Sequence, residues 1–434
     1  MRSFAPVHYN PHGNVPYGPE TARVGFYLYT EGGWVNPYIC LRTGPSAHVA
    51  PLFPLLLAAL YHVFGNGPAG SYAFQLAEAT VLTLEIAALP LVAEALGVDI
   101  MAGFVAAVLA VFGLGRDWHL EGNFVGLLLI VTTVLACKYL RTIENAKATR
   151  EGKSPLIESP ATLTVAMGVL WGAVLLTNPS AGLVWFSWLT LGGWYSYRRG
   201  FKRVWLLVLL IPAIMIAPWS WRNYRVFHGL VLVRSNLGLE LSVSNNPCAA
   251  YSMLLMRTNG CFWINHPNTS LDEARKVRDL GEITYNKIRL QQAKQWIRAN
   301  PGPFWKLTGQ RFFYFWFPAD NGRLSDAFRD PRSHSSTWIV YLLTPLSVFG
   351  LVTLWQTNRQ GALICASFLA LYPLIYYLVA FDYRYRYPII WVTFLLGSIP
   401  MWNCLQKVMD RFGLRVARSG WLVASATTGS AGDR

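Results

Sequence analysis

Residues 203–219 read RVWLLVLLIPAIMIAPW, an apolar run whose only charged residue is Arg203. Runs of about 20 apolar residues are the signature of a membrane-spanning helix. The pattern recurs along the chain and predicts nine spans, at about 71–96, 100–116, 124–140, 161–177, 180–197, 203–219, 337–355, 361–381 and 388–405. We therefore expect an all-α polytopic membrane protein.

The composition also indicates a membrane protein, because 53% of the 434 residues are hydrophobic and only 14% are charged. Soluble domains carry about 25% charged residues. A closed β-barrel would show alternating segments of about 10 residues, a pattern this sequence does not have. The formal net charge of +15 comes from short loops between apolar runs and from one long polar loop. The predicted partner is therefore the lipid bilayer, and no nucleic acid is expected.

The positive-inside rule predicts the orientation of the chain. Lys and Arg are concentrated in three segments that nine spans place on one side, the cytoplasm: 138–160, 197–203 and the tail after 405. The outer side then receives the first 48 residues, the turns at 116–123, 177–180 and 382–388, and the long loop 220–336. A polar N-terminal segment does not usually cross a membrane without an apolar helix ahead of it. We therefore expect that a first transmembrane helix is missing from the given sequence, with unaided export as the alternative.

The predicted domains follow from the positions of the apolar runs. They are a first outer loop with a short helix (1–70), about six spans (71–219), an outer soluble domain (220–336), about three spans (337–405) and a cytoplasmic tail (406–434). The apolar residues 49–64 in the first loop are too few for a span, which needs about 20. They predict an interfacial or re-entrant helix.

The outer domain is expected to be mixed in structure. Period-2 alternation predicts a strand over 229–235. An amphipathic helix is predicted over 271–299, with Ser270 as its N-cap and Glu273 three residues later, which is the spacing of a capping box. The aromatic residues of 302–317 predict a second helix lying on the membrane interface.

Two of the six cysteines, Cys248 and Cys261, lie 13 residues apart in the outer domain. A disulfide would form if that domain faces an oxidising compartment. Spacing alone fixes no geometry, so their pairing is left open.

The candidate catalytic residues are two glutamates on the predicted outer side. Glu20 precedes the stretch ARVGFYLYTEGG of the first loop, and Glu121 opens a span in WHLEGNFVGLLL. Two carboxylates that face one cavity suit general-base chemistry on a hydroxyl. They would equally hold a divalent cation, so no cofactor is predicted with certainty and a metal remains an alternative. Asp117 and His119 are supporting candidates, although Asp117 also suits an interaction with the helix dipole.

The candidate phosphate-binding residues are basic and also lie at the outer ends of spans. In DYRYRYP (382–388), an extended backbone would point Arg384 and Arg386 one way and the tyrosines, including the supporting candidate Tyr383, the other. Paired arginines bind phosphate through their fork geometry; the alternative is anchoring to anionic headgroups. Arg222 in PWSWRNYRVF has the same two interpretations, and His48 either donates to a phosphate or caps a turn.

Taken together, these motifs resemble the GT-C superfamily of polytopic glycosyltransferases, which use polyprenyl-phosphate sugars. The similarity is greatest to bacterial relatives of dolichyl-phosphate-mannose protein mannosyltransferases and of lipid A aminoarabinose transferases. The matching motifs, in chain order over about residues 20–390, are TGPSAHVAPLFPLLLAALYHVFG, WHLEGNFVGLLL, LLTNPS, APWSWRNYRVF, SNLGLELSVSNNP and DYRYRYP. The family begins with a transmembrane helix that this sequence lacks.

The resemblance implies roles for the candidate residues. Glu20 takes the place of the catalytic loop carboxylate, where the family usually has Asp, and Glu121 that of a second acidic residue. His48, Arg384 and Arg386 would hold the phosphate of the lipid-linked donor. The implied reaction is an inverting transfer to an unidentified acceptor, at the outer face of a bacterial inner membrane.

Two other functions remain as alternatives. A transporter or flippase of lipid-linked sugars would need charged or broken helices at mid-membrane, and the spans contain few such charges apart from Glu78 and Glu85. A non-catalytic protein of the same architecture is the other alternative.

Overall fold

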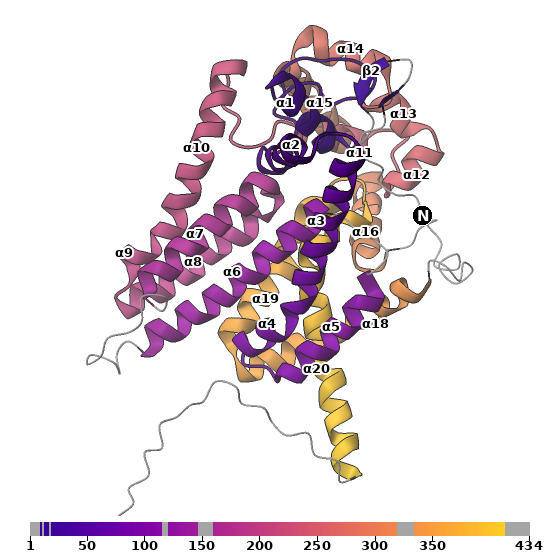
Figure 1. Cartoon of the computed structure of the whole chain (residues 1–434). Coiled ribbons are helices and arrows are strands. Elements are labelled where there is room, and N and C mark those ends of the chain that lie inside the picture. Colours follow the sequence, from indigo (N-terminus) through magenta and orange to yellow (C-terminus); the bar gives the residue numbers. More distant parts are fainter. Residues whose placement is uncertain are drawn as a thin grey trace, which may run out of the picture.

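The computed structural model describes residues 9–10, 13–16, 19–114, 120–145, 159–318 and 334–412 (Figure 1). Strand β1 (Tyr9–Asn10) pairs antiparallel with β2 (Gly13–Pro16). The other regular elements of the described ranges are helices. Their long, apolar members form a bundle, and a set of shorter helices lies at one end of it (Figure 1).

Seven helical segments in the described ranges are long and apolar enough to cross a membrane. They are α3 (Pro68–Ala87) with α4 (Leu89–Ala95), α6 (Leu120–Asn145), α7 (Pro160–Thr177), α9 (Lys202–Trp205) with α10 (Leu207–Phe227), α18 (His334–Thr357), α19 (Arg359–Leu371) with η3 (Tyr372–Tyr377), and η4 (Tyr383–Arg386) with α20 (Tyr387–Arg411). The chain thus has the architecture expected of an all-α polytopic membrane protein.

The two remaining predicted spans are helices that are not among these seven segments. Residues 100–116 give α5 (Ile100–Leu114), which at 15 residues is short for a bilayer. Residues 180–197 give α8 (Gly182–Arg199), which ends in two arginines and contains several Trp and Tyr residues. The count of nine spans and their orientation therefore remain predictions.

The helix α20 forms the centre of the bundle. In the segment of η4 and α20, 72% of the apolar 18-residue stretch is buried, against 22% in the segment of α9 and α10. Helix α20 packs closely on α18 through two glycines. A Cβ on Gly350 would lie 1.8 Å from the carbonyl oxygen of Leu396, and one on Gly397 would lie 2.9 Å from Leu343. Small residues of this kind let helix backbones approach in a membrane, where the hydrophobic effect does not drive helices together.

The first outer loop contains a helix that was not expected from the sequence. Residues Glu20–Glu31 form α1, which ends at Gly32 in the left-handed conformation (φ 68°). The helix packs on α2 (Leu52–Phe64), and Gly25 permits the contact because an added Cβ would lie 2.9 Å from Leu57 Cβ. The buried residues of α1 are Arg23, Val24, Gly25, Phe26 and Tyr27. Tertiary contacts therefore stabilise a helix whose pattern is weak by itself. The short helix predicted over 49–64 is present as α2.

The outer domain is helical where it is described. It contains α11 (Leu237–Ser244), α12 (Met253–Thr258), α13 (Cys261–Asn265), α14 (Leu271–Leu280), α15 (Glu282–Ala299) and α16 (Pro301–Trp316). The strand predicted over 229–235 is wrong. Side chains of α10 bind its backbone instead: Trp219 Nε1 donates to the Val233 carbonyl (2.8 Å) and Asn223 Nδ2 to the Val231 carbonyl (3.1 Å).

The helix predicted over 271–299 is divided in two. Gly281 adopts a positive φ of 78° between α14 and α15 and redirects the chain. The predicted N-cap is confirmed, since Ser270 Oγ accepts from the Glu273 amide (3.4 Å). Cys248 and Cys261 form a disulfide with their Cα atoms 5.6 Å apart, which joins the segment after α11 to the start of α13.

Candidate functional site

The candidate site lies where the first outer loop and the outer domain meet the end of the helix bundle. Figure 1 shows α1, α2 and α11 together at this end. The N-terminal turn of α6 contacts η4 here. Elements from the first loop, α6, the outer domain and η4 thus meet in one region.

Glu20 stands in the first turn of α1 and is paired with a buried arginine. Its side chain is 20% exposed, and Oε1 lies 3.8 Å from Nη2 of Arg23. Arg23 is fully buried and donates from Nε to the Pro37 carbonyl (2.6 Å) and from Nη2 to Asn268 Oδ1 (2.6 Å). Arg23 therefore ties α1 to the first loop and to the outer domain, and it fixes the position of the carboxylate.

Two buried histidines lie within electrostatic range of this carboxylate. Burial alone would raise the pKa of Glu20, but Arg23, His266 and His48 outweigh burial and hold that pKa at about 2. Burial lowers the pKa of His48 to about 3 and the pKa of His266 to about 4. At neutral pH the site therefore holds an ionised Glu20 beside two uncharged imidazoles.

Tyr38 fixes the orientation of His48. The Tyr38 hydroxyl lies 3.1 Å from Nδ1 of His48, and the two rings meet edge-on at 5.1 Å between centroids. The Tyr38 ring also contacts His266 at 6.1 Å. Tyr38 is fully buried, so it acts as the shared packing partner of both histidines.

The loop that carries His48 is held by Glu282 at the start of α15. The Glu282 carboxylate accepts from the Ser46 hydroxyl (2.6 Å), the Ala47 amide (2.8 Å) and the Ser235 hydroxyl (2.6 Å). Burial raises the pKa of Glu282, and these hydrogen bonds oppose that rise. Glu282 therefore holds the loop that carries His48 in place.

Arg222 supports the same loop. It donates to the carbonyls of Ser46 (2.9 Å) and Trp34 (3.1 Å) and lies over the ring of Trp219 at 5.0 Å. Its donors are thus directed at backbone groups of the first loop. Arg222 therefore lies with Glu282 among the groups that hold this loop.

Glu121 lies in the first turn of α6, as predicted, and faces the segment that carries Arg384. A Cβ on the adjacent Gly122 would lie 3.8 Å from the Arg384 carbonyl oxygen. The Glu121 carboxylate interacts with the Thr21 hydroxyl of α1, and it lies within electrostatic range of Glu20 and Arg384. The structure therefore brings Glu20, Glu121 and Arg384 together.

The segment DYRYRYP is not extended. It forms the 3₁₀ helix η4, in which Arg384 and Arg386 have different surroundings. Arg384 is 41% exposed, and its Nε lies 3.5 Å from Asp382 Oδ2. Arg386 is 2% exposed and donates to the Trp316 carbonyl (2.7 Å), Thr344 Oγ1 (2.8 Å) and Thr393 Oγ1 (3.1 Å). Arg384 is thus available to a ligand, whereas Arg386 joins α16, α18 and α20.

Arg234 and Glu240 also belong to this cluster and were missed in the sequence. Arg234 Nε donates to the His48 carbonyl (3.0 Å), and Arg234 interacts electrostatically with Glu121 and Glu240. Burial raises the pKa of Glu240, while Arg234 acts to lower it. Both are isolated charges in the apolar stretch LVLVRSNLGLELSV, and that isolation was the signal that could have identified them.

The remaining predicted residues contribute less to the description of the site. Tyr383 is 45% exposed, with its ring 6.3 Å from that of Tyr387. Asp117 and His119 lie outside the described residues. Among the residues that are described, no group of three or more His, Cys, Asp or Glu side chains is placed to hold a metal ion.

Comparison with known proteins adds no family assignment: no protein-family model matches the chain, and no curated protein matches it.

Proposed function

We propose that the chain is a membrane glycosyltransferase of the GT-C type, which transfers a sugar from a polyprenyl-phosphate donor to an acceptor hydroxyl. The observation that supports this most is the convergence of Glu20, Glu121 and Arg384 at one end of an apolar helix bundle. Such a site offers a carboxylate for the acceptor and a cation for a phosphate, next to a bilayer that would take the polyprenyl tail. The orientation predicted from Lys and Arg is that this end faces the outside, and the resemblance implies that the membrane is a bacterial inner membrane.

In the proposed reaction, the acceptor oxygen attacks the anomeric carbon and the bond from that carbon to the phosphate oxygen breaks. The electron pair of the broken bond leaves with the polyprenyl phosphate, whose charge Arg384 stabilises. The acceptor proton passes to the Glu20 carboxylate. Direct attack inverts the anomeric centre.

Glu20 is ionised at neutral pH, and its low pKa has a consequence for the timing of proton transfer. A carboxylate with a pKa of about 2 takes little proton from a neutral alcohol before attack. Transfer becomes favourable as the carbon–oxygen bond forms and the acceptor hydroxyl becomes acidic. Glu240, whose pKa is raised by burial, is the competing base in the same cluster.

The direct test is to reconstitute the full chain in nanodiscs and offer it polyprenyl-phosphate sugars with hydroxyl acceptors. Mass spectrometry would follow the released polyprenyl phosphate, which is common to all such donors. The Glu20→Gln and Glu121→Gln variants should each lose release. Thermal melts of the same preparations would show that both remain folded, with a lower melting temperature for Glu20→Gln because Arg23 loses its paired carboxylate. If release survives in both variants, the catalytic assignment is wrong.

One observation favours a second function, transport of lipid-linked sugars. Glu85 on α3 is 1% exposed, and neither of its carboxylate oxygens has a hydrogen-bond partner. Ionisable groups inside membrane helices often mark transport paths. Movement of a fluorescent polyprenyl-phosphate sugar between leaflets of a proteoliposome, without its consumption, would support this function over transfer.

A further inference from the structure

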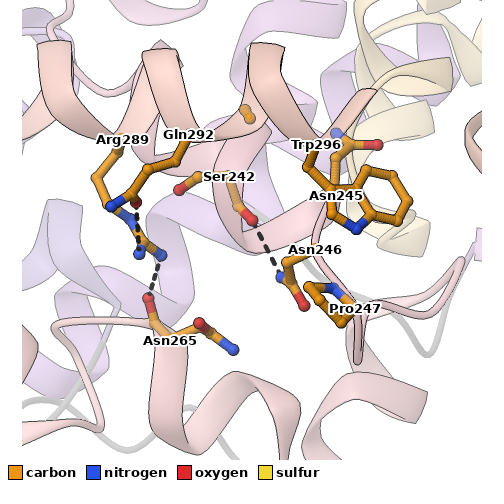
Figure 2. A pocket seen from close by; sticks show the side chains of 9 residues that line it. Ser242, Asn245, Asn246, Pro247, Asn265, Arg289, Gln292 and Trp296 are labelled. Carbon is orange, nitrogen blue, oxygen red and sulfur yellow. Dashed lines mark hydrogen bonds between the residues drawn. The ribbon is translucent and has the colours of Figure 1, made fainter. Parts of the chain in front are cut away.

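A cavity of about 250 Å³ opens in the outer domain between α11, α13 and α15 (Figure 2). It lies across α11 from the candidate site. Gly238 faces α15, since a Cβ there would lie 2.0 Å from the Asn286 carbonyl oxygen, and Ser242 follows one turn later and lines the cavity. Glu240 lies between them in sequence, and residues two apart do not share a helix face. The cavity is therefore a second location, separate from the carboxylate cluster.

The lining of the cavity combines amide groups with an aromatic ring. It comprises Ser242, Asn245, Asn246, Pro247, Asn265, Arg289, Gln292, Ala293 and Trp296. Figure 2 shows Arg289, Gln292 and Asn265 at one end and Trp296 with Asn245 at the other. Amides both donate and accept hydrogen bonds, and an indole offers a flat apolar face. Asn245 and Asn246 already use their amide donors within the protein. The exposed Gln292 amide and the Trp296 ring are left for a ligand, and they suit one with a hydroxyl edge and an apolar face.

The charge of Arg289 does not favour an anion. Its Nη2 donates to the Asn265 carbonyl (2.9 Å), and its Nη1 contacts Gln292 Oε1 (3.3 Å) and lies 3.6 Å from Glu273 Oε2. A phosphate or sulfate binds best to an unoccupied guanidinium fork. Both Nη atoms of Arg289 are engaged, and only its buried Nε has no hydrogen-bond partner. The Gln292 contact is long and made by an exposed side chain, so a single ligand hydroxyl can replace it.

The walls of the cavity are held rigidly. Asn246 donates to the Ser242 carbonyl (3.0 Å) and accepts from the Cys248 amide (3.0 Å). The disulfide joins Cys248 to Cys261, whose carbonyl accepts from Asn265 Nδ2 (3.0 Å). A preformed site loses little conformational entropy when it binds a ligand.

We propose that this cavity binds one neutral sugar ring. Its volume is below the range of about 300–1,000 Å³ typical of sites for drug-sized ligands, which suits a single ring rather than a longer chain. The ring would stack on Trp296 and place hydroxyls against Gln292 and Arg289. The inference that this sugar is part of a glycan acceptor rests on the function proposed above, whereas the inference that the cavity binds a sugar does not.

The test uses the full chain in nanodiscs and saturation-transfer NMR with methyl glycosides of glucose, galactose, mannose, N-acetylglucosamine and arabinose. At least one should bind, and Trp296→Ala should weaken its binding about tenfold. Trp296→Phe should retain most of the affinity. This would show that Trp296→Ala loses affinity because it lacks an aromatic ring. The matched control is Trp305→Ala, because Trp305 is 66% exposed on α16 and does not line the cavity.

The proposal is overturned if no glycoside binds, if Trp296→Ala and Trp305→Ala bind equally well, or if inorganic phosphate or a serine-rich peptide binds in place of the sugars. The Glu20→Gln variant separates this proposal from the enzymatic one. It should bind the glycoside as the wild type does while losing transfer. If the wild-type chain binds a sugar in a Trp296-dependent way but shows no transfer, the cavity proposal stands and the glycosyltransferase proposal is wrong.

Discussion

Buried carboxylates occur in two regions of the molecule, and the structure treats them differently. In the outer site, Glu20 has Arg23 at 3.8 Å and Glu282 accepts three hydrogen bonds. In the seam between α3 and α6, Glu85 packs against Gly126, where a Cβ would lie 2.5 Å from its Oε1, and it has no hydrogen-bond partner. Unpaired charge is costly in an apolar interior, so of these two regions the outer one is built to hold ionised groups.

The same contrast separates two neighbouring arginines. Arg384 is 41% exposed and faces the carboxylates, whereas Arg386 gives its Nη donors to protein oxygens. Charge at the outer site is thus divided between groups that can meet a ligand and groups that hold helices together. The difference between the two kinds of group can be tested with single substitutions of Glu20 and Glu85 and of Arg384 and Arg386.

The largest effect is expected at Glu20. Glu20→Gln should reduce polyprenyl-phosphate release about 1,000-fold, because general-base catalysis is typically worth about 100- to 10,000-fold. Glu240→Gln should reduce it less than tenfold if Glu20 is the base. A larger loss at Glu240 than at Glu20 would move the base to α11. Glu31→Gln, at the far end of α1 and 41% exposed, is the control.

The two arginines should differ in what they lose. Arg384→Ala should lower release about 100-fold with little change in melting temperature, because it removes a cation from the leaving phosphate. Arg386→Ala should instead destabilise the fold by about 3 kcal/mol, since it removes charged hydrogen bonds from a buried position. Equal losses of stability in both variants would contradict the assignment of Arg384 to ligand binding and of Arg386 to helix packing. Release assays and thermal melts of the same preparations provide both readings.

Stability should fall as the pH is lowered below 6.5. The unfolded chain binds a proton on each histidine near the ordinary pKa of 6.5, whereas folded His48 and His266 do so only near 3 and 4. Their folded pKa values are depressed, so the stability they contribute is complete above 6.5 and is lost towards acid pH. The loss is about 1.4 kcal/mol per pH unit for each histidine.

The variant His48→Gln should therefore show a shallower dependence of melting temperature on pH between 6.5 and 4. His62→Gln, which changes an exposed residue of α2, should leave the slope unchanged. Identical slopes for the wild type and His48→Gln would contradict the assignment of this pH dependence to the buried imidazole.

The smallest effect is expected in the seam. Glu85→Gln removes a carboxylate that has no hydrogen-bond partner, so it should change the melting temperature by only a few degrees and leave release intact. Gly126→Ala provides the steric comparison and should destabilise more, because its Cβ would clash with the carboxylate. A complete loss of transfer in Glu85→Gln would show that the seam takes part in function.

The sequence predicted the long helices well, because apolar length is a strong and local signal. It also predicted the Ser270 cap and the position of Glu121 in the first turn of α6. It missed α1, whose helical pattern is stabilised by packing on α2, and it predicted a strand over 229–235 where side chains of α10 bind the backbone. Both errors come from tertiary contacts that override local preference.

The candidate site was predicted in part for the same reason. Glu20, Glu121, His48 and Arg384 were identified because charges at the ends of apolar runs are conspicuous. Arg234 and Glu240 join them only through the fold of the outer domain, and the pairing of Arg23 with Asn268 spans 245 positions of sequence. The separation of Arg384 from Arg386 depends on a 3₁₀ turn that alternation alone did not predict.

The most direct test of the central claim is to measure polyprenyl phosphate and glycosylated acceptor together in reconstituted wild-type chain. We expect the two products to appear in equal amounts and the sugar of a β-linked donor to be found with inverted, α configuration. Donor that crosses the membrane unchanged, with neither product formed from any sugar offered, would contradict it.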